Sequence, residues 1–394
     1  MKIAVVTLYP PKKAGSAFYS FNLYRELAKY FEVVILTDEK GNSKMIETIK
    51  AWNRNSILLP FQLFKKISQT KPSIVHFQIE YRTFNDNASL STLNALLATI
   101  LTRNLNVKLI ITLHGVISSA VIEKENVHSF SKLFTRILLT LFYRTLGTFS
   151  TKLVVHTKIT KQVLQEEYKI NPDKIVVIPH GVNHATIKRR RSSGKMVRVL
   201  FHGFVRAEKG LESLLRAISI VAVSHRNVKL TIAGGSPHQE RMTGTRYIEK
   251  LNKMVQTLQI EGHVEFIPGF LSEDKLEEQI LSSDIMVFPY TDQFLEASGA
   301  AARVMDYGKP IICTRTPRFI GDFEDQKDCL MITPNNEKEL AKAIIALIEN
   351  DTLRERISEN LKKKATNRYW NVLVKEYVRL FKGEKNENSV LSTH

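Results

Sequence analysis

The chain has 394 residues, of which 43% are hydrophobic and 24% charged, a composition typical of globular proteins and unlike that of disordered ones. This length exceeds one ordinary core and predicts two domains. No apolar run approaches the ~20 residues of a membrane-spanning helix, and the apolar run near the N-terminus is too short for a signal peptide. Cys313 and Cys329 are too few for a disulfide framework or a zinc site. We therefore expect a cytosolic protein.

The net charge is distributed unevenly along the chain. Residues 1–200 contain 30 Lys or Arg against 12 Asp or Glu, whereas residues 201–394 contain 27 of each, so the net charge of +18 lies in the first half. This imbalance indicates an anionic partner: nucleic acid, an anionic membrane surface or a phosphorylated acceptor. A solvated basic surface without a partner is the alternative.

Six apolar runs in the first half predict buried strands. Because these runs are continuous rather than alternating, both faces of each strand are expected to be buried, as in a parallel sheet. Helical segments, the first over residues 19–30, separate several of the runs, and the pattern predicts an open, doubly wound α/β sheet with ligands at the carboxyl ends of its strands. The runs are residues 3–8, 31–36, 73–78, 107–113, 152–156 and 174–178.

Polar or glycine residues follow most of these strands and should lie together at one edge of the sheet. They include Gly15 and Ser16 after the first strand and Gln78 and Glu80 at the end of the third. A single histidine after a strand is more often structural than catalytic. Three successive strands, however, end in His114, His156 and His180, and His114, next to Gly115, is the strongest candidate for a site residue.

The segment 129–151 predicts an amphipathic helix with basic and aromatic residues. Lys132 and Arg136 are one helical turn apart, and Arg144 lies two turns further on. Such a helix suits a membrane interface, but it equally suits an ordinary helix packed on the sheet. Both interpretations stay open from the sequence.

The segment 185–196 is a basic break that we interpret as an interdomain linker. It divides an N-terminal domain, residues 1–187, from a second domain, residues 197–365, with the linker at 188–196 and a C-terminal helix and tail at 366–394. The basic cluster Lys188–Arg191 has no aromatic interleaving and no nucleic-acid-binding module beside it. A solvated linker or a phospholipid contact is therefore expected, and nucleic acid is not.

The second domain repeats the pattern of buried strands followed by glycine turns, over residues 197–201, 228–233, 263–267, 285–289 and 311–314. Lys209 stands just before a predicted helix over 211–219, which places an ammonium group beside the positive end of a helix dipole. Later, a loop ends in Ser298-Gly299 at the start of another helix, predicted over 300–306. Free N–H groups there suit a diphosphate or a ribose-linked phosphate.

These motifs, in this order, resemble the GT-B glycosyltransferases of the retaining family 4 type. In the first domain the likeness rests on PPKKAGSAFYSFNLYREL, SIVHFQIEY and ITLHGV, and in the second on LFHGFVRAEKGLESLLRAI and the segment 284–314. The final RYWNVLVKEYVRLF is similar to the helix that crosses back to the first domain. The resemblance covers nearly the whole chain. It implies two Rossmann-like domains facing a cleft, a nucleotide-diphosphate sugar as co-substrate, and neither a metal nor a cofactor.

The resemblance also implies roles for individual residues. Lys209 and Arg206 would neutralise the leaving diphosphate, and His114 would line the reacting face. Glu296, or the amides of Ser298 and Gly299, would hold the sugar. The other implied donor contacts are Gly15, Gly203, Gly234, Gly269 and Phe270, and the implied acceptor contacts are Ser16, Gln78 and Glu80.

Two departures from the family pattern stand out. Phe204 occupies a position where many relatives have Arg, and Arg206 is the nearest guanidinium. Many relatives also carry two Glu residues eight positions apart in the donor segment, where this chain has Leu295 and Arg303, with Glu296 the nearby acid. The second departure leaves the transferred sugar unassigned.

The sequence therefore predicts a retaining transfer of a hexose from GDP-mannose or a UDP-sugar. The acceptor is expected to be lipid-linked, a polysaccharide or another hydroxyl compound at the cytosolic membrane face, with the enzyme peripheral on an anionic membrane. One alternative is a soluble transferase that makes a small glycoside. Another, of a different class, is a catalytically silent basic binding module.

Overall fold

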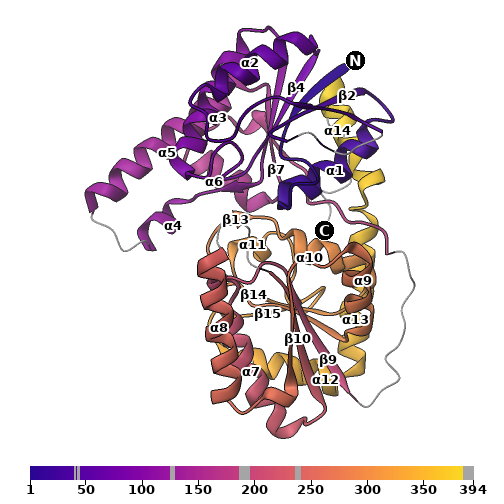
Figure 1. The fold of residues 1–394 in the computed structure, drawn as a ribbon. Coiled ribbons are helices and arrows are strands. Elements are labelled where there is room, and N and C mark those ends of the chain that lie inside the picture. Colours follow the sequence, from indigo (N-terminus) through magenta and orange to yellow (C-terminus); the bar gives the residue numbers. More distant parts are fainter. Residues whose placement is uncertain (40, 42–44, 125–128, 186–195, 236–240, 385–394) are drawn as a thin grey trace. The chain divides into compact units, whose positions relative to one another are not determined.

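A computed structural model describes residues 1–39, 41, 45–124, 129–185, 196–235 and 241–384. It divides the chain into two compact α/β units (Figure 1). Unit 1 comprises residues 1–181, 294–297 and 368–394, and unit 2 comprises residues 182–293 and 298–367. The basic cluster Lys188–Arg191, nearly all of the expected linker 188–196 and the tail beyond residue 384 lie outside the described residues.

Unit 1 contains a seven-stranded sheet in which every strand pair is parallel, as the continuous apolar runs predict. The predicted strands are present, and β3 is an addition. The β3 sequence, ETIK, is short and partly exposed at the sheet edge, so it lacks the apolar signal of a buried strand. The order is β3 (Glu47–Lys50), β2 (Glu32–Thr37), β1 (Lys2–Val6), β4 (Ile74–Ile79), β5 (Lys108–Leu113), β7 (Lys152–Val155) and β8 (Ile175–Val177).

Helices cover both faces of this sheet (Figure 1). On one face, α1 (Gly15–Leu27) and α14 (Trp370–Lys382) share a core with alternate strand residues such as Ile3 and Ile110. On the other face, α2 (Leu59–Thr70), α3 (Ala88–Arg103) and α5 (Ser129–Phe149) share a second core with Val6 and Phe77. The shorter α4 (Ser119–Lys124) and α6 (Lys158–Glu166) complete the unit.

The C-terminal helix α14 belongs to unit 1 because its apolar stripe packs into that core. Tyr377 and Phe381 are fully buried, and the hydroxyls of Tyr377 and Tyr19 share a hydrogen bond of 2.6 Å. Lys108 Nζ donates to the carbonyls of Leu380 and Phe381 and so neutralises the negative end of the helix. Helix α14, the last helix that the structure describes, is thus part of the same unit as the N-terminal residues.

Unit 2 contains a six-stranded parallel sheet, with β15 the strand that the sequence did not predict. Its order is β11 (Val264–Pro268), β10 (Val228–Gly234), β9 (Val197–His202), β12 (Ile285–Phe288), β14 (Ile311–Thr314) and β15 (Leu330–Ile332). Its helices are α7 (Leu211–Ser224), α8 (Arg241–Thr257), α9 (Glu273–Ser282), α10 (Gly299–Val304), α11 (Pro317–Ile320), α12 (Glu337–Glu349) and α13 (Asp351–Thr366).

Two short segments depart from the expected domain bounds. Residues 182–185, predicted in the first domain, belong to unit 2. Residues 294–297 belong to unit 1, although the sequence placed them in the second domain. The cause is a two-residue antiparallel ladder between β13 (Leu295–Glu296) and β6 (Gly115–Val116). Ladder pairing of this kind leaves no periodic signal in the sequence. It brings Glu296 beside the strand end that carries His114.

Within the described residues, no helix is both long and apolar enough to cross a membrane.

We predict that Phe381→Ala lowers the free energy of unfolding of unit 1 by about 3–5 kcal/mol, because it removes a fully buried aromatic ring and leaves a cavity. Val372→Ala on the same helix is the control, since Val372 is 38% exposed and its loss should cost less than about 0.5 kcal/mol. Urea denaturation followed by circular dichroism measures both. Equal losses would contradict the assignment of α14 to the core.

Candidate functional site

The predicted residues of unit 1 lie at the carboxyl edge of its sheet. Ser16 is in the first turn of α1, which follows β1, Gln78 is in β4, and His114 directly follows β5. Strands β1, β4 and β5 are neighbours in the sheet, which explains why residues distant in the sequence meet. The structure therefore brings the predicted acceptor residues and His114 into one polar cluster.

Ser16 and Glu80 form the first part of this cluster. The Ser16 hydroxyl donates to Glu80 Oε2 at 2.6 Å. Burial raises the pKa of the Glu80 carboxyl, and the nearby Glu296 carboxylate raises it further. A β-carbon at Gly15 would lie 3.9 Å from Glu80 Oε1, in ordinary contact, so the protein itself leaves space at this glycine.

A chain of hydrogen bonds fixes His114. Its Nε2 lies 2.7 Å from Gln78 Oε1, and its Nδ1 lies 3.3 Å from His156 Nε2. His156 Nδ1 is 2.9 Å from the carbonyl oxygen of Ile178, while Gln78 Nε2 donates to the Tyr24 hydroxyl. The imidazole of His114 is therefore held in one orientation by its neighbours on both sides.

Burial keeps His114 uncharged. Loss of solvent lowers its pKa well below the ordinary value, and His156, His180 and His76 lower it further by repulsion. Because both ring nitrogens already face protein partners, the neutral imidazole presents an uncharged ring at this edge of the sheet.

Sequence reasoning missed the aromatic residues that support these histidines. The ring centroid of Tyr19 lies 4.8 Å from that of His114, 5.0 Å from that of His156 and 4.9 Å from that of Trp370. Trp370 in turn fits over Gly181, where a β-carbon would lie 2.4 Å from its ring. The only sequence signal was the position of Tyr19 on the buried stripe of α1.

Glu296 joins the cluster of unit 1. Its side chain lies over Gly115, where a β-carbon would come within 2.8 Å of Glu296 Cγ. The sequence analysis expected Glu296 to hold the sugar as part of the donor segment. The structure places Glu296 next to Gly115 and near Glu80, because β13 pairs with β6, and its contact with the sugar stays a prediction.

In unit 2, Lys209 and Gly210 lie where the loop after β9 turns into α7. Gly210 has φ +68°, and a β-carbon there would lie 1.9 Å from the Pro289 carbonyl oxygen, so only glycine fits. Lys209 Nζ lies 3.8 Å from the centroid of the Tyr290 ring, a cation–π contact. The loop is tied to the end of β12 by the bond from the Thr291 amide to the Glu208 carbonyl.

Tyr290 is another residue of the site that was not predicted from the sequence. It also stacks near the guanidinium of Arg318, which forms a buried ion pair with Asp292 at 2.9 Å. This pair fixes the surface on which Lys209 rests.

Arg206 lies in the same loop and packs on aromatic rings. Its guanidinium carbon is 5.8 Å from the Phe204 ring centroid, and its Nη1 is 3.3 Å from Glu208 Oε1. Phe204 contacts Phe270 edge to face at 5.4 Å. Phe204, at the position where many relatives have Arg, is thus part of an aromatic pair.

The other predicted donor residues line the ends of β9, β10 and β11. Gly203 and Gly234 approach so closely that a β-carbon on Gly234 would lie 1.8 Å from the Gly203 carbonyl oxygen. Gly269 has φ +89° and precedes Phe270, which is 41% exposed. A cavity of about 400 Å³ lies beside this turn, between Ile267 and Gln279.

Ser298 forms the N-terminal cap of the helix that follows it. The Ser298 hydroxyl accepts a hydrogen bond from the Ala301 amide, and the Ser298 carbonyl accepts one from the Ala302 amide. The helix that follows, α10, has six residues and continues as a 3₁₀ turn. These two bonds use the amides of Ala301 and Ala302, and the assignment of the Ser298 and Gly299 amides to a ligand stays a prediction.

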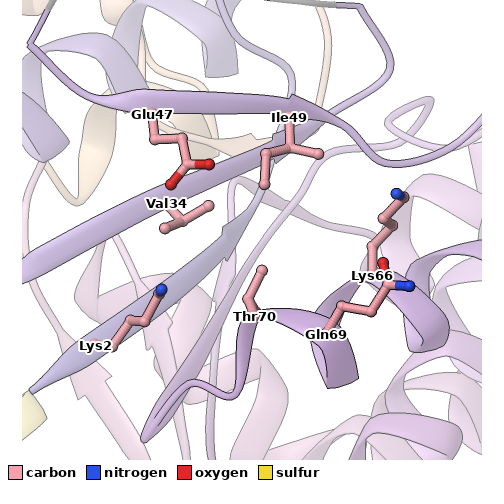
Figure 2. Close-up of a pocket in the computed structure, with 7 residues that line it drawn as sticks. All are labelled: Lys2, Val34, Glu47, Ile49, Lys66, Gln69 and Thr70. Atoms are coloured by element: carbon pink, nitrogen blue, oxygen red, sulfur yellow. The ribbon is translucent and has the colours of Figure 1, made fainter.

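A further hollow of about 200 Å³ lies at the opposite, amino edge of the unit 1 sheet (Figure 2). Its lining includes Lys2 at the start of β1, Glu47 at the start of β3 and Thr70 at the end of α2. Lys2 already forms an ion pair with Glu32 at 3.0 Å. None of the residues predicted for the site lies in this hollow.

In the part of the chain that the structure describes, no three His, Cys, Asp or Glu side chains are grouped so that they could hold a metal ion.

Two family models match the chain and together span most of it. Residues 14–186 match the model described as glycosyltransferase family 4, and residues 184–364 match the model described as glycosyl transferases group 1. The predicted residues of both carboxyl edges lie inside these ranges.

Individual proteins give the same indication. An uncharacterized glycosyltransferase of Methanocaldococcus jannaschii, MJ1178, is 23% identical over 94% of this chain and 95% of its own length. A second from that organism, MJ1607, is 27% identical, but the match spans 59% of this chain and 60% of that protein. Among solved structures, Anabaena Alr3699/HepE in complex with UDP has a TM-score of 0.74 at 14% identity, covering 97% of this chain and 99% of that one. At 14% identity, the similarity to Alr3699/HepE shows only that the two proteins share a fold.

We predict that the stability of unit 1 falls as the pH is lowered below about 6.5, because its buried histidines take up protons only after unfolding. Burial lowers the pKa of His76 to about 3, so its contribution is complete above the unfolded value of 6.5 and is lost as the pH falls toward 3. His76→Gln should therefore reduce the slope of unfolding free energy against pH by up to about 1.4 kcal/mol per pH unit near pH 5.

Urea denaturation at several pH values between 7.5 and 5 measures this slope. Identical slopes in the two proteins would show that His76 is charged in the folded state.

Proposed function

The chain belongs to the GT-B glycosyltransferases, and from this premise we propose that it transfers a hexose, with retention of configuration, from a nucleoside diphosphate sugar to a hydroxyl acceptor. The observation that carries the proposal is the loop of Lys209 and Gly210 at the start of α7. An ammonium group there lies beside the amides and positive dipole of a 14-residue helix, which suits a diphosphate.

Unit 2 is proposed to bind the donor. Lys209 and Arg206 neutralise the diphosphate, while the turn at Gly269-Phe270 and the cavity beside it receive the base. Alr3699/HepE, whose fold is similar, was solved with UDP and with UDP-glucose, which supports a nucleotide sugar as donor. A UDP-sugar or GDP-mannose remains the proposed donor class, and neither a metal nor a cofactor is invoked.

Unit 1 is proposed to bind the acceptor. Glu80 and Ser16 offer hydrogen bonds to sugar hydroxyls, and the uncharged His114 lines the reacting face. The Glu80 carboxyl accepts hydrogen bonds through two oxygens, which suits a hydroxyl-rich ligand.

The proposed chemistry places most of the catalytic effect on the leaving group. As the glycosyl bond breaks, negative charge grows on the diphosphate, and the two cations of the loop stabilise it. The leaving phosphate then accepts the proton of the attacking hydroxyl on the same face of the sugar, which retains the anomeric configuration. A two-carboxylate hydrolase scheme is not required.

The acceptor is proposed to be lipid-linked or otherwise presented at the cytosolic face of a membrane. The basic excess of residues 1–200 supports an anionic surface as partner. A soluble transferase that makes a small glycoside, and a silent binding module, are the competing functions.

The direct test is release of UDP or GDP by purified protein supplied with a panel of UDP-sugars and GDP-mannose, with and without a membrane lipid extract. We expect release that requires the extract. Release with small soluble acceptors alone would favour the small-glycoside function. No release from any donor, together with no thermal shift by UDP or GDP, would favour the silent module.

We predict that Lys209→Ala weakens binding of UDP or GDP by about 10- to 100-fold, because a charge-assisted hydrogen bond of about 1.5–3 kcal/mol is lost. Isothermal titration calorimetry measures the change. Lys229→Ala is the matched control, since Lys229 lies at the start of β10, at the opposite edge of the same sheet. Unchanged affinity in Lys209→Ala would contradict the assignment of the phosphate loop.

A further inference from the structure

Helix α3 turns its polar side chains toward the protein and its leucines toward the outside. It buries the small or polar residues Ser91, Asn94, Thr99 and Thr102, together with two alanines, against the rest of unit 1. The hydroxyls of Thr99 and Thr102 donate to carbonyls of their own helix. A surface helix of a soluble domain normally shows the opposite distribution.

The leucines of α3 form its outward face. Leu90, Leu93 and Leu97 are 49%, 48% and 39% exposed, and their spacing places them on one side of the helix. Single exposed leucines are common on protein surfaces, but a stripe that runs along a helix is not.

Helix α5, which packs beside α3, continues this outward stripe. Leu133, Phe134, Ile137, Leu138 and Leu141 are each 48–57% exposed. The sequence analysis left open whether this segment packs its apolar side on the sheet. The structure shows that Phe142 and Leu146 do so, while the five residues nearer the start of the helix face outward.

Helix α2 packs on the other side of α3, and its Phe61 is exposed together with Ile57 and Leu58, the two residues just before the helix. Ile57, Leu58 and Phe61 are 89%, 61% and 59% exposed. We call these exposed residues, on α3, on α5 and at the start of α2, the apolar face. The three helices lie side by side over one face of the sheet (Figure 1).

The apolar face is electrically one-sided. The 12 residues of α2, the 16 of α3 and the 21 of α5 contain two, one and three Lys or Arg, respectively, and no Asp or Glu. The other α-helices that the structure describes in unit 1, namely α1, α4, α6 and α14, each contain an acid. Lys132 and Arg136 pair with Glu123 of α4.

The apolar face lies toward the edge of the sheet that carries the candidate site. In a parallel α/β unit each crossover helix starts at the carboxyl edge, and the exposed apolar residues are in the first part of all three helices. The start of α2 is also tied to the loop after β4, because Arg54 Nη2 donates to the Arg82 carbonyl at 2.6 Å. Glu80 of the site lies at the beginning of that loop.

We propose that the apolar face inserts shallowly into an anionic lipid bilayer and so brings the acceptor site of unit 1 to a lipid-linked acceptor. The exposed aliphatic and aromatic side chains enter the interfacial region, and Lys132 and Arg136, which lie among them on α5, are the cations nearest to anionic headgroups. The benefit to catalysis rests on the proposed function, whereas membrane binding itself does not.

A second copy of the chain is a less suitable occupant. A two-fold symmetric interface pairs the same patch with itself, so the basic residues of one copy would face those of the other. An anionic bilayer presents the opposite charge across the whole face.

The test is flotation of the full chain with vesicles of phosphatidylcholine alone and with 30% phosphatidylglycerol. We expect binding to the anionic vesicles that is at least 10-fold stronger than to the neutral ones and weakens in 0.5 M salt. The double variant Phe134→Glu/Ile137→Glu should reduce binding at least 10-fold, and Leu93→Ser/Leu97→Ser should reduce it without a change in charge. Val223→Glu, at a position 81% exposed on α7 of unit 2, is the control and should bind as the wild type does.

Thermal shift by UDP or GDP, measured on every variant, reports donor binding and correct folding independently. Flotation that is absent, or equal in the wild type and both double variants, overturns the inference while leaving the proposed function intact. A concentration-dependent dimer in sedimentation that Phe134→Glu/Ile137→Glu abolishes, without flotation, assigns the face to a second copy and equally overturns it.

Discussion

Burial of both faces of two parallel sheets is the constraint on which the rest of this structure depends. Parallel strands need crossover helices, and these helices cover the sheet and leave the carboxyl ends of the strands together at one edge. In unit 1 this edge gathers Gln78 of β4, His114 after β5 and Ser16 of α1, the helix that follows the neighbouring β1. In unit 2 it gathers the glycine turns of β9, β10 and β11 and the loop that carries Lys209. Each candidate half-site is thus a consequence of sheet topology rather than of any single motif.

The side chains at these edges are fixed by packing from within their own units. In unit 1, Tyr19 stands against His114 and His156, and Trp370 and Tyr377 of the last helix stand against Tyr19. In unit 2, the Arg318–Asp292 pair and Tyr290 support Lys209. A preorganised site is what electrostatic stabilisation of a leaving group requires, because donors that must first move contribute less.

Helices α2, α3 and α5, which cover one face of the unit 1 sheet, have an inner side that packs on the sheet and an outer side that is exposed. Their inner sides close a core with Val6 and Phe77, and their outer sides expose leucine, isoleucine and phenylalanine on helices that contain no acidic residue. In α3 the exposure of leucine and the burial of threonine reverse the usual preference for folding in water. This arrangement is the basis of the proposal that unit 1 meets a lipid surface.

The sequence by itself determined the two parallel sheets, the positions of the main strands along the chain, the C-terminal helix and the membership in a glycosyltransferase fold. Continuous apolar runs and glycine turns depend only on neighbouring residues, so they can be recognised from the sequence alone. The weak edge strands β3 and β15 were missed because ETIK and LMI are too short to carry such a signal. Only the tertiary structure decided that Glu296 lies with His114, because the β13–β6 ladder joins residues about 180 positions apart. Only the tertiary structure also decided which side of α3 and α5 faces outward, since periodicity gives the stripes of a helix but not the neighbour each stripe meets.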